Sequence, residues 1–103
     1  MEIFDNKHFM MIEPKCKPIE TDDDVISKAV DVWINCKPTN QFYRGFHRCS
    51  CGEISDNQNW LTPMGRITNN LIVHYIQYHR KSVPESELKK LDQEFDKIQT
   101  LGD

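Results

Sequence analysis

The residues best able to do chemistry in this chain are two cysteines and three histidines in two short segments. Cys49 and Cys51 stand two positions apart, and His47 precedes them at the same spacing. His74 and His79 follow in a stretch with helical periodicity. Thiolate and imidazole are the ligands that structural zinc sites prefer. The two segments therefore predict a zinc site with one ion per chain.

The predicted ligands are four, with one in reserve for either helix histidine: Cys49, Cys51, His74 and His79, and the reserve His47. One residue between the cysteines is tighter than the usual zinc spacing, so the chain must turn sharply there. Gly52 follows directly and can supply the positive φ that such a turn requires. A disulfide between the two cysteines is disfavoured. Residues i and i+2 of an extended chain lie about 6.5 Å apart, near the upper limit for a disulfide, and the small ring would be strained.

The two helix histidines are five positions apart, so they sit about 140° from each other around a regular helix. Zinc fingers use such spacing where the last helical turn loosens. His79 also falls within an apolar stripe, where an imidazole needs a partner. The alternative is that His79 is an ordinary histidine at the edge of the core and the cysteines are ordinary buried thiols. The grouping of all these donors in two segments favours metal.

Periodicity and turn residues predict the elements that position these ligands. Residues 21–36 form a helix, with Thr21 and Asp24 as a capping box. Residues 42–61 form a hairpin that carries the two cysteines at its tip. A short strand over residues 8–12 precedes these elements.

Two further helices complete the prediction. The first spans residues 68–81 and is capped by Thr68 or Asn69. The second spans residues 84–100 and opens at Pro84, which fits a first helical position. A narrow apolar seam on this last helix faces the core by default.

The predicted fold class is α+β: a small, zinc-stabilised single domain in which a β-hairpin, the His/Cys knuckle, packs on two or three helices. The whole chain of 103 residues is expected to be one domain. Its parts are a strand and connector (1–20), a first helix (21–41), the hairpin with the histidine helix (42–81) and a C-terminal helix (82–103). A domain of this size has only a modest hydrophobic core, so a bound structural metal would add useful stability.

Composition limits the class of protein. The formal net charge of −3 argues against a polybasic nucleic-acid binder or a membrane-surface protein. No apolar run is long enough for a membrane span, and the first residues lack the order of a signal peptide. We therefore expect a cytoplasmic protein whose four cysteines are reduced.

The middle of the chain is nevertheless basic, since residues 43–81 carry five basic and two acidic side chains. The basic residues of this segment could ring the metal site: Arg44, Arg48, Arg66, Arg80 and Lys81. One interpretation is a small surface for an anion or a nucleic acid. The other is ordinary solvated charge, with Arg80 and Lys81 at the negative end of a helix.

The run Tyr-Arg-Gly-Phe-His-Arg-Cys-Ser-Cys-Gly at residues 43–52, followed by Thr-Asn-Asn-Leu-Ile-Val-His-Tyr at 68–75, resembles a group of small uncharacterised bacterial proteins. The resemblance covers roughly residues 42–92. It implies that the His/Cys segment and the histidine helix belong to one unit. The group brings no established activity with it.

Three functions are compatible with these patterns. The first is a zinc-binding protein-interaction or regulatory module without catalytic activity, whose partner-facing residues would be Arg44, Arg48, Trp60, Tyr75, Tyr78 and Arg80. The second is a zinc-finger-like nucleic-acid-binding protein with weak affinity. The third is a zinc-dependent hydrolase or a Cys/His enzyme, with Glu53, Asp56 or His47 in supporting roles. The first is favoured, because no recognised acid/base motif is present.

Overall fold

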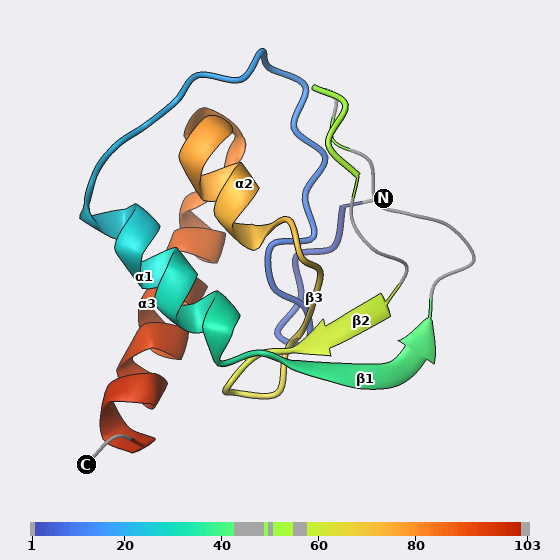
Figure 1. Cartoon of the computed structure of the whole chain (residues 1–103), viewed down its shortest axis with the longest axis vertical. Coiled ribbons are helices and arrows are strands. Elements are labelled where there is room, and N and C mark those ends of the chain that lie inside the picture. The colour runs from blue at the N-terminus through green and yellow to red at the C-terminus, as the bar shows by residue number, and fades with distance from the viewer. Residues whose placement is uncertain (1, 43–48, 50, 55–57, 102–103) are drawn as a thin grey trace.

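The computed structural model describes residues 2–42, 49, 51–54 and 58–101, and the chain has an α+β fold. Its helices are α1 (Asp24–Ile34), α2 (Ile72–Tyr78) and α3 (Glu85–Leu101), and a 3₁₀ turn, η1 (Arg80–Ser82), precedes α3. The strands β1 (Lys37–Phe42), β2 (Gln58–Leu61) and β3 (Ile67–Thr68) form an antiparallel sheet in the order β1-β2-β3. Figure 1 shows α1 packed against both α2 and α3, with the sheet to one side. The predicted α+β class is confirmed.

The first predicted helix is present but begins later than expected. Its N-cap is Asp23, whose carboxylate accepts the Val25 N–H at 3.2 Å. The predicted cap Thr21 instead donates its backbone N–H to the Gln77 carbonyl at 2.7 Å. A carboxylate at the N-cap satisfies an otherwise free backbone donor and suits the positive end of the helix.

The predicted hairpin begins earlier than residue 42. Residues 37–40, which lie between the predicted helix and the predicted hairpin, belong to β1, where Pro38 lies opposite Trp60 on β2. A proline is tolerated there because β1 is an edge strand of the sheet. Trp60 in turn packs on Trp33 of α1, with ring centroids 4.8 Å apart. This contact joins the sheet to the helices.

The predicted helix over 68–81 is shorter than expected at its start. Ile67 and Thr68 form β3, which pairs with β2 across a turn where Gly65 has a φ of +83°. Asn69, one of the two predicted caps, accepts the Leu71 N–H at 2.8 Å just before α2 begins. Tertiary pairing therefore overrides helical periodicity for these first residues.

The predicted strand over residues 8–12 is wrong. Within the part of the chain that the structure describes, the N-terminal segment makes two isolated bridges, between Ile3 and Met11 and between His8 and Ile67. Met10 has a φ of +56°, which interrupts any regular strand. The segment is instead a core element, with these residues nearly inaccessible: Phe9, Met10, Met11 and Ile12.

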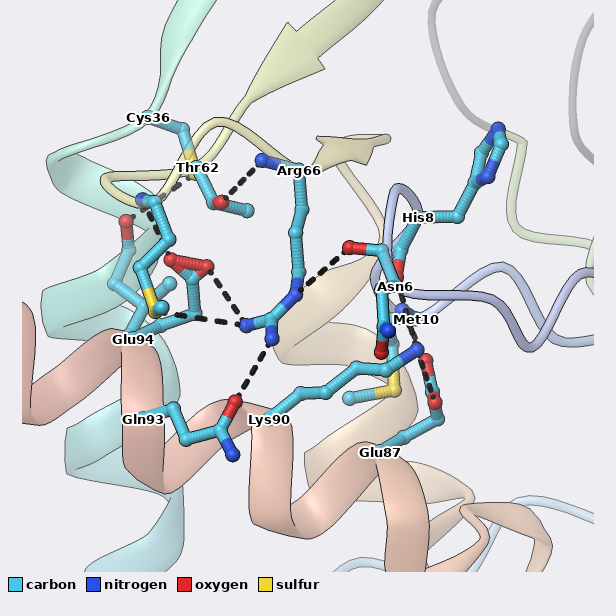
Figure 2. A network of polar contacts seen from close by, with 12 residues as sticks. Asn6, His8, Met10, Cys36, Thr62, Arg66, Glu87, Lys90, Gln93 and Glu94 are labelled. Atoms are coloured by element: carbon cyan, nitrogen blue, oxygen red, sulfur yellow. Dashed lines mark hydrogen bonds and ion pairs between the residues drawn. The ribbon is translucent and has the colours of Figure 1, made fainter.

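The last predicted helix is confirmed as α3, but it buries charge as well as its apolar seam. Leu91 is in the core as expected, and Glu87, Lys90 and Glu94 are buried beside it. Figure 2 shows Glu87 and Lys90 directed towards the N-terminal segment and Glu94 directed towards Arg66. Among the described residues, no helix combines the length and apolarity that a membrane span requires.

Candidate metal centre

The two predicted cysteine ligands lie on a tight turn. The Cys49 N–H donates to the Glu53 carbonyl at 2.8 Å, and the Gly52 N–H donates to the Cys49 carbonyl at 3.0 Å. Gly52 has a φ of +104°, as the sequence predicts for this position. Cys49 is buried and belongs to the hydrophobic core, whereas Cys51 is exposed. The turn thus holds one thiol inside and one at the surface.

The two predicted histidine ligands lie on α2 and at its C-cap. His74 is within the helix, and His79 is its C-cap, with φ and ψ of −130° and 37°. The backbone leaves the α-helical path at His79 and continues into η1. Their ring centroids come within 5.1 Å of each other. The predicted loosening of the last turn is confirmed, and it turns the second imidazole towards the first.

These two segments bring the four side chains into one cluster. Their ligand atoms all lie within 4.8 Å of one another. The contacts are Cys49 Sγ to His79 Nε2 at 3.0 Å, Cys51 Sγ to His74 Nε2 at 3.2 Å, and Sγ to Sγ of the cysteines at 3.5 Å.

The three short contacts can be compared with the ligand separations of a tetrahedral zinc site. Zn–S and Zn–N bonds place two sulfurs about 3.8 Å apart, and a sulfur and a nitrogen about 3.6 Å apart. The three contacts are shorter than these values by about 0.3 to 0.6 Å, and the remaining pairs of ligand atoms lie within 4.8 Å. A metal ion could therefore be held by small side-chain movements, without rearrangement of the backbone.

Burial lowers the pKa of both histidines and so favours the neutral imidazoles that bind metals. Burial lowers the pKa of His79, and the neighbouring His74 lowers it further. Burial also lowers the pKa of His74, opposed in part by the negative charge of Glu53. The pKa of the Tyr75 hydroxyl is raised above its usual range, first by burial and then by Cys49 and Cys51. Neutral imidazole offers its lone pair to a cation at neutral pH.

Several other predicted residues are not assembled around the cluster. Arg66 is buried against Glu94 of α3, at 3.5 Å. Arg80 makes two hydrogen bonds to the Asp23 carboxylate, at 2.8 and 3.0 Å. Tyr75 is 1% exposed and cannot contribute to a partner surface, which corrects that prediction.

The remaining predicted surface residues are placed as follows. Trp60 lies on β2 against Trp33, and the Tyr78 ring lies 5.3 Å from that of His74. Lys81 is exposed. The reserve ligand and three other predicted residues lie outside the part of the chain that the structure describes: His47, Arg44, Arg48 and Asp56.

One contact of the cluster could not be predicted from the sequence. Cys16 Sγ lies 3.5 Å from Nδ1 of His79 and 3.0 Å from Oγ of Ser82. No local pattern links Cys16 to a histidine so distant in the chain. Cys36 is away from this cluster, and its thiol donates to the Val32 carbonyl at 3.3 Å. Burial, followed by the charge of Glu94, raises the pKa of Cys36 to about 12.

Comparison with protein-family models, with curated proteins and with solved structures gives no match for this chain. The resemblance to small bacterial proteins therefore stays a prediction. The functional argument has to come from the chain's own residues, and its central finding is a Cys₂His₂ cluster that could hold a metal ion.

Proposed function

We propose that this protein is a small zinc-binding module that acts through a protein partner and has no catalytic turnover. The observation that carries the proposal is the convergence of two thiols and two imidazoles within 4.8 Å. Two sulfur and two nitrogen ligands in a tetrahedral arrangement favour Zn²⁺ over the oxygen-seeking cations. Zinc in this site is a structural ion.

The position of the cluster supports a structural role. Residues 43–57 connect β1 to β2, and the cysteine turn lies within this long connection. Bringing the two ends of a connection of that length together costs conformational entropy. Zinc bound to Cys49 and Cys51 would fasten the connection to the end of α2 through His74 and His79.

The same donor set argues against the hydrolase alternative. A catalytic zinc site keeps one coordination position for water or substrate, usually with three protein ligands. Here four side chains converge, and once all four bind the ion they leave no open position. Glu53 is close enough to influence His74, but it would have no metal-bound water to act on.

Charge pairing argues against the nucleic-acid alternative. Two of the five basic residues in the central segment are already paired with carboxylates, Arg66 with Glu94 and Arg80 with Asp23. Even if the other three all contacted phosphates, they could displace few of the counterions of a phosphate backbone. We expect weak binding to DNA or RNA that fades steeply as salt rises, and the aromatic and arginine residues favour a protein partner.

The test is the metal content of protein purified without an affinity tag. We expect one zinc per chain in the native protein and its loss in Cys51→Ser, together with a lower melting temperature. Cys36→Ser is the matched control, because Cys36 bonds a helix carbonyl away from the cluster. If Cys51→Ser keeps both its zinc and its stability, the assignment of the site is wrong.

A second measurement tests how the protein acts. Titration of the zinc-loaded protein with single-stranded RNA and duplex DNA at physiological salt should show only weak binding. Tight, salt-resistant binding to either nucleic acid would overturn the choice of a protein partner. A cobalt-substituted protein should give the absorption spectrum of a four-coordinate tetrahedral site, whereas a five-coordinate spectrum would indicate a bound water and favour the hydrolase.

A further inference from the structure

His79 makes polar contacts through both of its ring nitrogens. Nε2 lies 3.0 Å from Sγ of Cys49 inside the cluster. Nδ1, on the other edge of the ring, lies 3.5 Å from Sγ of Cys16. The imidazole, which is 1% exposed, is therefore held between two thiols from distant parts of the chain.

Metal binding fixes the direction of these hydrogen bonds. An ion on Nε2 uses the lone pair of that nitrogen, so the single ring proton must reside on Nδ1. Nδ1–H then donates to the sulfur of Cys16. The Cys16 thiol can donate in turn to Oγ of Ser82 at 3.0 Å. The hydrogen bonds then run from His79 to Cys16 and from Cys16 to Ser82, which lies outside the metal cluster.

The segment that carries Cys16 is itself anchored to the end of α2. The backbone N–H of Ile19 donates to the Tyr78 carbonyl at 2.8 Å, and that of Thr21 donates to the Gln77 carbonyl at 2.7 Å. Figure 1 shows this N-terminal connector passing over α2 before α1 begins. The connector therefore satisfies carbonyls that the helix end leaves free, and it places Cys16 at a fixed distance from His79.

We propose that Cys16, supported by Ser82, is a positioning residue of the metal centre: it holds the His79 ring with Nδ1 protonated and Nε2 directed at the ion. The inference rests on the proposed zinc site. Outer hydrogen-bond partners of metal-bound histidines typically change metal affinity by about 10- to 100-fold. Sulfur is a weak acceptor, so we expect the lower end of this range.

Access of solvent limits how much zinc affinity the loss of Cys16 can cost. A small pocket lies beside this contact and is bordered by Cys16, Tyr78 and His79 among others. In Cys16→Ala, water entering from this pocket can accept the hydrogen bond from Nδ1–H in place of the thiol. The affinity for zinc then falls only moderately, while exchange of the ring proton with solvent becomes much faster.

The first experiment measures zinc affinity by competition with a chelator in otherwise native protein. We expect Cys16→Ala to bind zinc about tenfold more weakly and Cys16→Ser to recover part of the loss, because a hydroxyl is also an acceptor. Cys36→Ala is the matched control and should bind like the native protein. An affinity of Cys16→Ala equal to that of the control would overturn the proposal.

The second experiment follows the Nδ1–H proton of His79 by NMR in the zinc-loaded protein. We expect slow exchange with solvent in the native protein and fast exchange in Cys16→Ala, a change that a purely structural role of Cys16 would not produce. Ser82→Ala, which removes only a hydroxyl, should speed exchange to an intermediate rate. Unchanged exchange in Cys16→Ala would refute the contact. Native protein that binds no zinc would instead refute the proposed function.

Discussion

Glu87 provides a sharp test of how α3 holds the N-terminal segment. Its side chain is 0% exposed, and its Oε1 accepts the Met10 N–H at 3.0 Å. Its Oε2 pairs with the Lys90 ammonium at 2.8 Å. Figure 2 shows Glu87 and Lys90 on α3, close to Met10. The substitution Glu87→Ala removes both interactions at once.

The expected cost follows from what remains buried. Lys90 is 7% exposed and still donates to the carbonyls of Asp5 and His8, at 2.7 and 3.0 Å. Its hydrogen bonds persist, but its charge loses the neutralising carboxylate. Breaking a buried ion pair from one side costs about 3–5 kcal/mol, and an unsatisfied buried backbone N–H, here that of Met10, costs about 1–3 kcal/mol. Because the Lys90 ammonium keeps its hydrogen bonds to these two carbonyls, we expect Glu87→Ala to lower the free energy of unfolding by about 3 kcal/mol.

For a domain of this length, that loss corresponds to a fall of about 12 °C or more in melting temperature. The assay is urea unfolding followed by circular dichroism, on variants with equal zinc content. Glu85→Ala is the matched control, because Glu85 is exposed in the first turn of the same helix and loses only its interaction with the helix dipole, below about 1 kcal/mol.

A third variant separates the two contributions. Glu87→Gln keeps an acceptor for the Met10 N–H but removes the charge opposite Lys90, so its stability should fall between those of the native protein and Glu87→Ala. If Glu87→Ala and Glu85→Ala unfold within about 1 kcal/mol of each other, the buried pair contributes nothing to stability and the reasoning fails.

Two further predictions concern titratable groups. In the metal-free protein the pKa values of His74 and His79 lie below the ordinary 6.5, so the unfolded chain takes up protons first as the pH falls. Stability should therefore be complete above about pH 6.5 and be lost as the pH falls through the folded pKa values, which urea unfolding at stepped pH would show; stability that rises on acidification would contradict this. The Cys36 thiol, with its pKa raised to about 12, should react with iodoacetamide far more slowly than the exposed Cys51 in metal-free protein, and equal rates by mass spectrometry would contradict it.

Local signals predicted the donors and two of the helices. The ligand types of Cys49, Cys51, His74 and His79 identify a candidate metal site, because thiolate and imidazole have few other reasons to recur so closely. Gly52 marks the turn that presents the cysteines, since a positive φ is costly for most other residues. The helices α1 and α3 follow from apolar periodicity that depends on each segment alone.

The sequence was least informative where an element depends on a distant partner. β1 begins at Lys37 because the segment finds β2 to pair with, although Pro38 reads locally as a breaker. Thr68 was expected to begin a helix, yet Ile67 and Thr68 pair with β2, and Ile67 also bonds to the N-terminal segment. Strand pairing is a long-range property that no short window of sequence contains.

Tertiary structure also decided how polar groups are satisfied inside the molecule. Glu87, Lys90 and Glu94 appear solvent-facing in a helical pattern, but folding buries them against backbone groups and a charged side chain from distant segments. Cys16 reaches His79 only because the connector bonds to the end of α2. The sequence by itself determined which donors could bind a metal. Only the fold decided which outer groups hold those donors, because burial and direction arise when separate segments pack together.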